Sequence, residues 1–284
     1  MIIQKALSLG ITQLKDLDIP NPQLDAKILL KFLLGYTSEV FELKRNEEIS
    51  DNYIKNYLKL IKRRSNREPI AHIVEKKSFW KNDFKVSKAT LIPRPETELI
   101  IENVLKYFPN KSSNLNIIDL GTGTGCIIIS LIQEYVNATG IGIDISQSAI
   151  DIANINKQIL RNPEKLDFFK ADFKDYDLDK FDIIVTNPPY VSHEDKEKNL
   201  QHDILHYEPH IALFADNNGL NCYEKIFNNI TLCKKNNCYM FIEVGIGQSQ
   251  EVSNLLKYNE FNIVSIENDL ANIPRCIVAK KIKK

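Results

Sequence analysis

The sequence predicts an α/β fold in which a small helical module precedes a parallel sheet covered by helices on both faces. Two observations lead to this prediction. In the first ~70 residues apolar side chains recur at helical spacing. From about residue 93 onward, short β-branched runs alternate with stretches of helix length. Parallel strands need crossover helices to connect them, so this alternation favours a sheet with helices on both sides.

Composition narrows the class of protein before any motif is considered. The chain has 284 residues, of which 43% are hydrophobic and 26% charged, as in an ordinary globular protein. Its 37 Lys and Arg balance 37 Asp and Glu, and this neutrality disfavours a stable nucleic-acid binder. No apolar run approaches the ~18 residues of a membrane helix. Five cysteines without a C-x-x-C pair predict a reducing, cytoplasmic setting.

The helical module is predicted to span residues 1–75 and to bind a partner. Residues 1–90 hold 17 Lys and Arg against 11 Asp and Glu, so this part is mildly basic. Pro22 suits the start of a helix that ends near Gly35, and Ser50 is predicted to cap a further helix. A β-hairpin linker is predicted over residues 76–92, where aromatic and polar residues alternate around a turn.

The remainder, residues 93–284, is predicted to hold the sheet. The expected strands are Asn116–Leu120, Ile141–Asp144, Leu166–Phe169, Phe181–Thr186, Tyr239–Val244, Asn262–Glu267 and Cys276–Lys280. Ligands of such sheets bind at the carboxyl ends of the strands, where the site is therefore expected.

A glycine-rich turn follows the first of these strands. Its sequence is Asp119-Leu120-Gly121-Thr122-Gly123-Thr124-Gly125, and an apolar segment of helix length comes next. Glycines allow a sharp turn and a close approach of ligand to backbone, so we predict a nucleotide-type cofactor here. The third glycine comes one residue earlier than in the dinucleotide pattern G-x-G-x-x-G, which favours a ligand without pyrophosphate. Asp144, at the end of the second strand, is expected to accept ribose hydroxyls.

The segment Asn187-Pro188-Pro189-Tyr190 ends the fourth strand. Its prolines stiffen the backbone and lack N–H donors, so the Asn187 side-chain oxygen and the Pro188 carbonyl form a row of acceptors. Such a row suits a planar –NH2 group, with the ring of Tyr190 beside it. An amide nitrogen is a poor nucleophile, and aligning its lone pair helps only against a strong electrophile. A sulfonium methyl group is such an electrophile and carries no phosphate.

These two segments resemble the class I S-adenosylmethionine-dependent methyltransferases that modify amino nitrogens. Glu68–Ile73, Leu91–Glu98 and Tyr207-Glu208-Pro209 are further similar to the HemK/PrmC family, the N5-glutamine methyltransferases of peptide chain release factors. The resemblance covers nearly the whole chain. It implies a Rossmann-like, seven-stranded methyltransferase domain and a substrate, the glutamine of the Gly-Gly-Gln motif in class-1 release factors. It also implies a cytoplasmic enzyme, for which we expect a monomer with no nucleic-acid or membrane partner.

The resemblance also implies roles for individual residues. The turn Gly121–Gly125 would hold the methionine part of S-adenosylmethionine, and Asp144 its ribose. Asp172 and Phe173 would border the adenine, although relatives often carry Trp at the second position. Asn187 would meet both cofactor and substrate amide, with Pro188 as second acceptor and Pro189 and Tyr190 completing the substrate site.

Other readings of the sequence remain open. Asn-Pro-Pro-Tyr also suits an amino methyltransferase that acts on adenine or guanine in nucleic acid; a non-catalytic binding module and a nicotinamide dehydrogenase are further alternatives. No metal is expected: His202, His206 and His210 are four residues apart, but Pro209 interrupts their helix. The sequence leaves open whether Glu96 or Glu98 reaches the cofactor.

Overall fold

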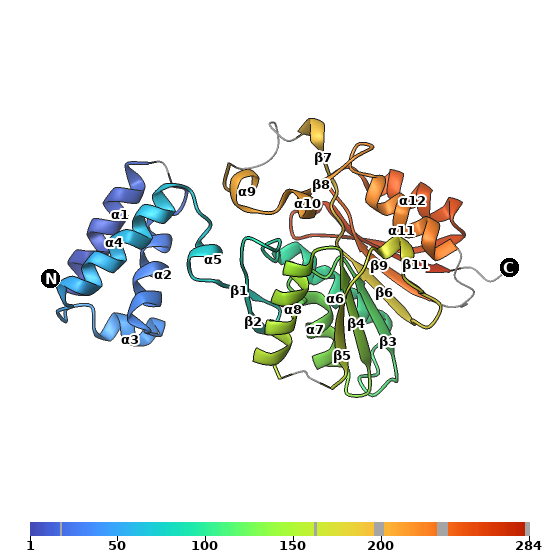
Figure 1. Ribbon diagram of the computed structural model, residues 1–284, viewed down its shortest axis with the longest axis horizontal. Coiled ribbons are helices and arrows are strands. Elements are labelled where there is room, and N and C mark those ends of the chain that lie inside the picture. The colour runs from blue at the N-terminus through green and yellow to red at the C-terminus, as the bar shows by residue number, and fades with distance from the viewer. Residues whose placement is uncertain (18, 162–163, 196–201, 232–237, 282–284) are drawn as a thin grey trace. The chain divides into compact units, whose positions relative to one another are not determined.

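The computed structural model describes residues 1–17, 19–161, 164–195, 202–231 and 238–281 (Figure 1). The chain divides into two compact units. A helical unit comprises Met1–Lys76 and Gln201–Tyr207, and a sheet unit comprises Lys77–Leu200 and Glu208–Lys284. In the described part of the chain, no helix combines the length and the apolar character that crossing a membrane requires. The expected roles of the helical module in partner binding and of the hairpin as a linker stay predictions.

The helical unit is built on short amphipathic helices. They are α1 (Ile3–Lys15), α2 (Pro22–Leu34), α3 (Ser38–Leu43), α4 (Asp51–Ser65), α5 (Ile70–Ile73) and, from later in the chain, α9 (His202–Tyr207). Pro22 occupies the first turn of α2 and the helix ends at Gly35, as predicted; Gly35 adopts the left-handed conformation with φ 67°. Ser50 takes the predicted N-cap position of α4, but its side chain makes no capping hydrogen bond there.

A buried ion cluster ties α9 to this unit. The Arg64 guanidinium on α4 donates to Asp25 on α2 at 2.7 Å and to Asp203 on α9 at 2.8 Å. Beside it, the Tyr207 hydroxyl donates to the Asn66 carbonyl at 2.7 Å. A buried guanidinium needs such partners, because desolvating it without them costs several kcal/mol. The contacts explain why a helix more than a hundred residues downstream belongs to the helical unit.

The predicted hairpin consists of β1 (Lys76–Phe79) and β2 (Asn82–Lys85). Trp80 in its turn adopts a left-handed conformation with φ 53°. Its backbone N–H donates to Glu98, and its indole N–H donates to Glu134 at 2.9 Å. Trp80 therefore packs and anchors the hairpin, and the Glu98 carboxylate holds its turn.

All seven strands of the central sheet are confirmed, and their order is β10-β11-β9-β6-β3-β4-β5. Their bounds are β3 (Asn116–Leu120), β4 (Thr139–Asp144), β5 (Leu166–Lys170), β6 (Ile183–Thr186), β9 (Tyr239–Glu243), β10 (Phe261–Asn268) and β11 (Pro274–Lys281). The strands from β9 to β5 run parallel, whereas β11 pairs antiparallel with both β9 and β10. The order reverses at β3, which has β4 on one side and β6 on the other.

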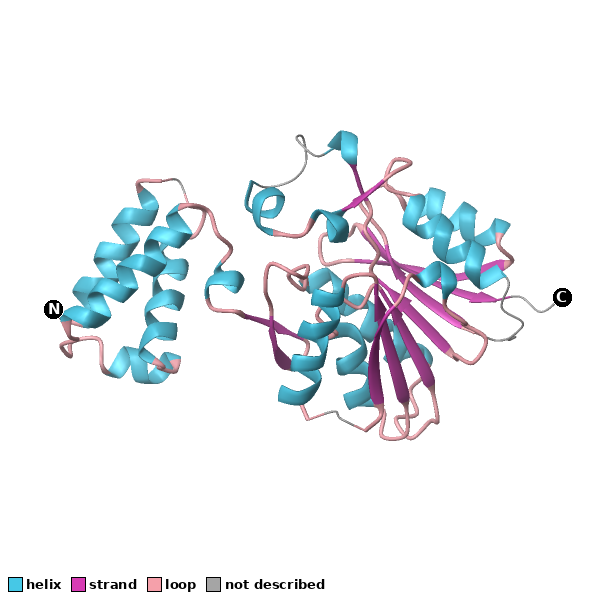
Figure 2. Cartoon of the chain, viewed as in Figure 1, coloured by secondary structure: helices cyan, strands magenta, loops and turns pink. Residues whose placement is uncertain are grey.

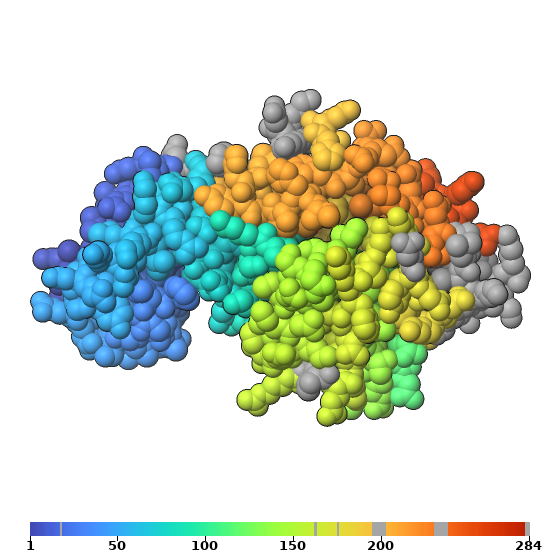
Figure 3. All heavy atoms as spheres, in the orientation of Figure 1, coloured from blue at the N-terminus to red at the C-terminus, as the bar shows by residue number. Residues whose placement is uncertain are grey.

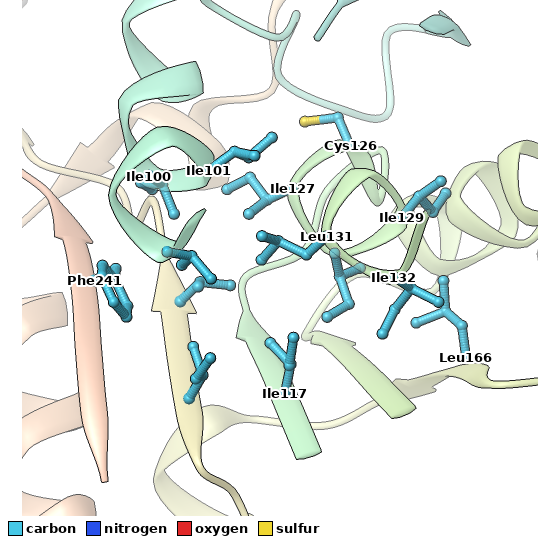
Figure 4. Packing of buried hydrophobic residues seen from close by; sticks show 14 of the residues in the cluster. Ile100, Ile101, Ile117, Cys126, Ile127, Ile129, Leu131, Ile132, Leu166 and Phe241 are labelled. Atoms are coloured by element: carbon cyan, nitrogen blue, oxygen red, sulfur yellow. The ribbon is translucent and has the colours of Figure 1, made fainter. Parts of the chain in front are cut away.

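Helices cover both faces of the sheet (Figures 1 and 2). One face packs against α6 (Glu98–Tyr107), α7 (Cys126–Glu134) and α8 (Gln147–Ile159). The other packs against α11 (Asn221–Thr231) and α12 (Ser249–Tyr258). Figure 4 shows the first of these cores, where isoleucines of α6 and α7 meet Ile117 of β3. Strand residues contribute alternately to the two cores, as Ile117 and Ile118 do.

Several short helices and strands complete the sheet unit. They are η1 (Pro95–Thr97), η2 (Phe173–Asp175), β7 (Val191–Ser192), η3 (His193–Asp195), α10 (His210–Leu213) and β8 (Phe214–Ala215). Strands β7 and β8 pair in parallel as a separate two-stranded sheet.

One buried side chain joins three parts of the sheet unit. Asn156 on α8 accepts from the Lys85 N–H at 2.7 Å and donates to the Lys85 carbonyl at 3.0 Å. It also donates to the Thr124 carbonyl of the glycine turn at 2.9 Å. The amide thus satisfies backbone groups of both the hairpin and the turn.

We expect Asn156→Ala to lower the free energy of unfolding of the sheet unit by about 2–4 kcal/mol, because it leaves buried backbone groups unpaired. The single tryptophan, Trp80, lies in this unit, so urea denaturation followed by its fluorescence measures the loss. Asn154→Ala on the same helix is the matched control, since within the described part of the chain Asn154 donates only to the Ile150 carbonyl of its own helix. Equal stability of the two variants would contradict the role of Asn156.

Candidate active site

A cavity of about 340 Å³ lies at the carboxyl ends of the parallel strands. Loops that follow β3, β4, β5 and β6 all contribute to its wall. The predicted site residues that line it are Gly121, Thr122, Gly123, Thr124, Asp144, Asp172, Phe173, Asn187 and Pro189. Three others do not line it, namely Gly125, Pro188 and Tyr190. The fold therefore gathers most of the predicted site, and the individual roles stay predictions.

The three glycines of the turn serve different purposes. All have positive φ, with values of 74° at Gly121, 54° at Gly123 and 79° at Gly125. A Cβ added at Gly121 or Gly123 would meet no atom within 4 Å, so both positions face open space. A Cβ at Gly125 would lie 2.9 Å from the Phe168 ring. The first two glycines thus open a cradle in the cavity wall, and the third permits close packing beneath it.

Asp144 ends β4 with its carboxylate held at both oxygens. The Gly123 N–H donates to Oδ2 at 3.0 Å, and the Ser146 N–H donates to Oδ1 at 2.9 Å. Burial raises the pKa of Asp144, while these N–H groups act in the opposite direction. Each oxygen retains a lone pair. A fixed carboxylate on the cavity wall is suited to accepting hydrogen bonds from a ribose diol.

Asp119 lies beneath the glycine turn and is fully buried. The Thr122 hydroxyl donates to it at 2.7 Å, which links the end of β3 to the turn. Burial raises the pKa of Asp119 to about 7, and the nearby charge of Asp144 acts in the same direction. The carboxyl therefore titrates near neutral pH in the folded protein.

Asp172 and Phe173 follow β5 at the start of η2. The Asp172 side chain accepts from the Lys174 N–H at 3.1 Å, which fixes the short turn. Phe173 presents a ring to the cavity while it packs against the second core. A flat ring beside an acceptor suits a planar base, and the adenine site stays a prediction.

The loop after β6 rests on two residues that sequence reasoning missed. The Asn187 amide donates to Thr97 at 3.1 Å, and the Thr97 hydroxyl donates to Glu243 at 2.6 Å. The Tyr190 hydroxyl donates to the other carboxylate oxygen of Glu243 at 3.1 Å. Burial raises the pKa of Glu243, whereas both hydroxyls oppose this shift. The sequence offers one signal that Glu243 belongs to the site, because it is an acidic residue near the carboxyl end of a predicted strand.

An ion pair holds the segment that contains Thr97. Arg94, which lines the cavity, bonds Glu208 at 2.5 Å, and the Ile92 N–H donates to the same carboxylate at 2.9 Å. Pro209 follows Glu208 and immediately precedes α10. The segment around α10 and α11 contributes further cavity residues; in Figure 3 its atoms (orange) border those of the yellow-green segment that includes α8.

Several candidates lie away from the cavity. Glu96 and Glu98 do not line it, and Glu98 is bonded to the hairpin. His206 belongs to α9, which ends at Tyr207, whereas His210 begins α10, so the predicted break in the helix is confirmed. Among the described residues no group of three or more His, Cys, Asp or Glu could hold a metal ion.

The residues present fit a nucleoside-type cofactor next to an amide-binding corner. The open glycine cradle, the fixed carboxylate of Asp144 and the ring of Phe173 match the three parts of S-adenosylmethionine in the order that the resemblance implies. Asn187 borders the same cavity.

We expect Asp144→Ala to weaken S-adenosylmethionine binding about tenfold or more, because a carboxylate that accepts two hydroxyls is removed. Isothermal titration calorimetry measures the dissociation constant. The matched control is Asp151→Ala, a change at an exposed aspartate on α8. An unchanged constant in Asp144→Ala would argue against ribose binding by this residue.

Asp119 gives the apo protein a defined dependence of stability on pH. Its pKa is 3.8 as a free side chain and about 7 when folded, so the folded state binds the proton more tightly. The tighter proton binding by Asp119 stabilises the folded state. This stabilisation is complete below the pKa of the free side chain and is lost as the pH rises through 7. Between pH 5 and 8.5 the unfolding free energy of Asp119→Asn should therefore rise relative to wild type by roughly 3 kcal/mol. Urea titrations at both pH values measure the difference; a constant difference would contradict the buried ionisation.

Comparison with known proteins agrees with this architecture. The PrmC N-terminal domain family matches residues 5–74, and the methyltransferase domain family matches residues 111–260. Among solved structures, the hMettl16 catalytic domain in complex with a 3′UTR hairpin has a TM-score of 0.57 and 14% identity, with 83% of each chain covered. At this identity the likeness supports the fold alone.

Curated relatives span the whole chain. The release factor glutamine methyltransferase of Buchnera aphidicola is 36% identical, with 100% of both chains covered. That of Caulobacter vibrioides is 32% identical and covers 99% of this chain and 97% of the relative. The bifunctional methyltransferase of Rickettsia conorii is 33% identical, but this chain spans only 58% of its length. Together with the two domain matches, these similarities show that the chain belongs to the release factor glutamine methyltransferase family.

Proposed function

We propose that this protein transfers a methyl group from S-adenosylmethionine to the side-chain amide nitrogen of the glutamine in the Gly-Gly-Gln motif of class-1 release factors. The observation that carries the proposal is the position of Asn187. It borders the same cavity as the glycine cradle and Asp144, so a bound amide would lie next to the cofactor. The end-to-end similarity to release factor glutamine methyltransferases supports the same substrate.

The chain's own residues would bind and orient the two reactants. Gly121 and Gly123 would let the cofactor approach the backbone, Asp144 would hold the ribose, and Asp172 and Phe173 would enclose the base. S-adenosylmethionine, when bound, supplies an electrophilic sulfonium methyl group. Because this electrophile is strong, the protein needs no metal and no covalent intermediate, and alignment accounts for most of the catalysis.

Asn187 and Pro188 would align the nucleophile. The Asn187 Oδ1 atom would accept one amide N–H and the Pro188 carbonyl the other, which weakens delocalisation of the nitrogen lone pair and directs it at the methyl group. Pro188 itself is buried, but its neighbours Asn187 and Pro189 both line the cavity. Transfer would form the N–CH3 bond and break the S–CH3 bond, so that S-adenosylhomocysteine leaves. The proton that the amide nitrogen loses would pass to water.

The proposal extends to setting and assembly. We take the enzyme to be a cytoplasmic monomer that binds release factors and forms no stable complex with nucleic acid. The balance of 37 basic and 37 acidic residues supports the absence of a stable nucleic-acid complex. Cys126, Cys222 and Cys276 form no disulfide among the described residues, which supports the cytoplasmic setting.

The direct test is mass spectrometry of purified class-1 release factor after incubation with this protein and S-adenosylmethionine. We expect one added methyl group on the Gly-Gly-Gln glutamine and no methyl transfer to duplex DNA or to RNA supplied in parallel. Methylation of the nucleic acid and not of the release factor would favour the amino methyltransferase of bases.

Asn187→Ala should lower kcat/KM for release factor at least thirtyfold, equivalent to about 2 kcal/mol, because an aligned acceptor is lost. Asn254→Ala, which changes an exposed asparagine on α12, is the matched control and should behave as wild type. Turnover near the wild-type rate in Asn187→Ala would refute the proposed role of the amide.

A further inference from the structure

Asn187, Thr97 and Glu243 are joined by hydrogen bonds that all run from donor to acceptor in the same direction. Thr97 ends η1, Glu243 ends β9, and Asn187 directly follows β6, the parallel neighbour of β9. The Asn187 amide meets the Thr97 hydroxyl at 3.1 Å, and this hydroxyl meets Glu243 at 2.6 Å. The three side chains come from separate segments and form one continuous chain of hydrogen bonds.

The chemistry of the groups fixes this direction. The Thr97 hydroxyl has a single proton, and it donates this proton to Glu243 at 2.6 Å. The Thr97 oxygen can then only accept, and the end of the Asn187 amide that faces it must be the –NH2 group. The Oδ1 atom of Asn187 is thereby left as an acceptor, and it has no hydrogen-bond partner among the described residues.

The backbone of the loop after β6 is held by contacts other than the hydrogen bonds that join Asn187, Thr97 and Glu243. The Gln248 amide donates to the Tyr190 carbonyl at 3.0 Å and accepts from the Gly245 N–H at 3.1 Å. An added Cβ at Gly219 would lie 2.1 Å from the same Tyr190 carbonyl, so the loop is also tightly packed. Loss of the Thr97 hydroxyl should therefore free the Asn187 side chain to rotate without displacing the loop.

We propose that Glu243 and Thr97 are positioning residues that fix Asn187 as an acceptor and so make the site select a carboxamide nitrogen over a carboxylate. An acceptor attracts the –NH2 end of glutamine and repels the oxygens of glutamate. It also directs the nitrogen of the amide, rather than its oxygen, toward the methyl donor. This inference rests on the proposed function, because it takes Asn187 to contact the substrate side chain.

The test compares Thr97→Val, which removes the hydroxyl at nearly constant shape, with Thr97→Ser, which keeps it. The full-length protein with bound S-adenosylhomocysteine is titrated calorimetrically with a class-1 release factor that carries Gly-Gly-Gln, and with its Gly-Gly-Glu variant. Wild type and Thr97→Ser should bind the glutamine form about tenfold tighter or more. In Thr97→Val this ratio should fall to about threefold or less, because the amide can rotate.

Turnover gives a second readout. With S-adenosylmethionine and the glutamine form, kcat of Thr97→Val should fall roughly tenfold or more, while KM for the cofactor stays within about threefold of wild type. Thr97→Ser should restore kcat. If Thr97 had a merely structural role, Thr97→Val would weaken binding of the glutamine and the glutamate forms equally. The ratio of the two affinities would then stay unchanged.

Glu243→Gln tests the direction independently and covers the case in which Thr97→Val does not fold. Tyr190 can still donate to the remaining oxygen, while the new –NH2 group donates to Thr97. The Thr97 proton then turns toward Asn187 and reverses the amide. The preference for the glutamine form should fall at least threefold or invert.

The outcomes separate the two proposals. If wild type methylates the glutamine but the ratio stays unchanged in both Thr97→Val and Glu243→Gln, the selection by hydrogen-bond direction is overturned and the proposed function stands. If wild type neither binds nor methylates the release factor, the proposed function fails and this inference fails with it.

Discussion

The parallel register of β3, β4, β6 and β9 is the constraint on which the site depends. It brings the ends of these strands to one edge, so that the glycine turn, Asp144, Asn187 and Glu243 become neighbours although more than a hundred residues separate the first from the last. The order of strands reverses at β3, and the cavity forms where the connections diverge to opposite faces. Any slip of one strand would move its terminal side chain out of the site.

The energetic support of this edge comes from two sources. The apolar cores on both faces fix the strands and α7, which starts at the turn, and Figure 4 shows isoleucines of α7 within one of these cores. Outside the cores, individual side chains form hydrogen bonds with buried polar groups. Asn156, for example, pairs backbone groups of the hairpin and of the glycine turn. A cavity wall made of backbone and carboxylates needs this second kind of support, because unpaired buried polar groups cost about as much as lost core contacts.

The geometry explains how a protein could act on an unreactive nitrogen without a strong base. The reagent would supply the driving force, and the protein would supply orientation. A side chain orients a substrate reliably only when it has a single arrangement. A side-chain amide has two arrangements of nearly equal shape, which differ by an exchange of its oxygen and its –NH2 group. The hydroxyl and carboxylate behind Asn187 remove this ambiguity, so the same contacts that hold the loop also define which chemical group it accepts.

The sequence by itself determined the seven strands, the glycine turn, the helical module and the rigid corner at Asn187, because periodicity, glycine and proline act over a few neighbouring residues. It also determined the family, because its motifs are short and contiguous. Ser50 shows a limit even for local signals, since a residue of the right type at the right place makes no capping contact. Only the tertiary structure decided that Thr97 and Glu243 lie behind Asn187, that Glu98 serves the hairpin, and that α9 joins the helical unit through Arg64. These contacts join residues that are distant in the chain, and the direction of a hydrogen bond depends on which donors and acceptors the fold brings within about 3 Å, which no local pattern specifies.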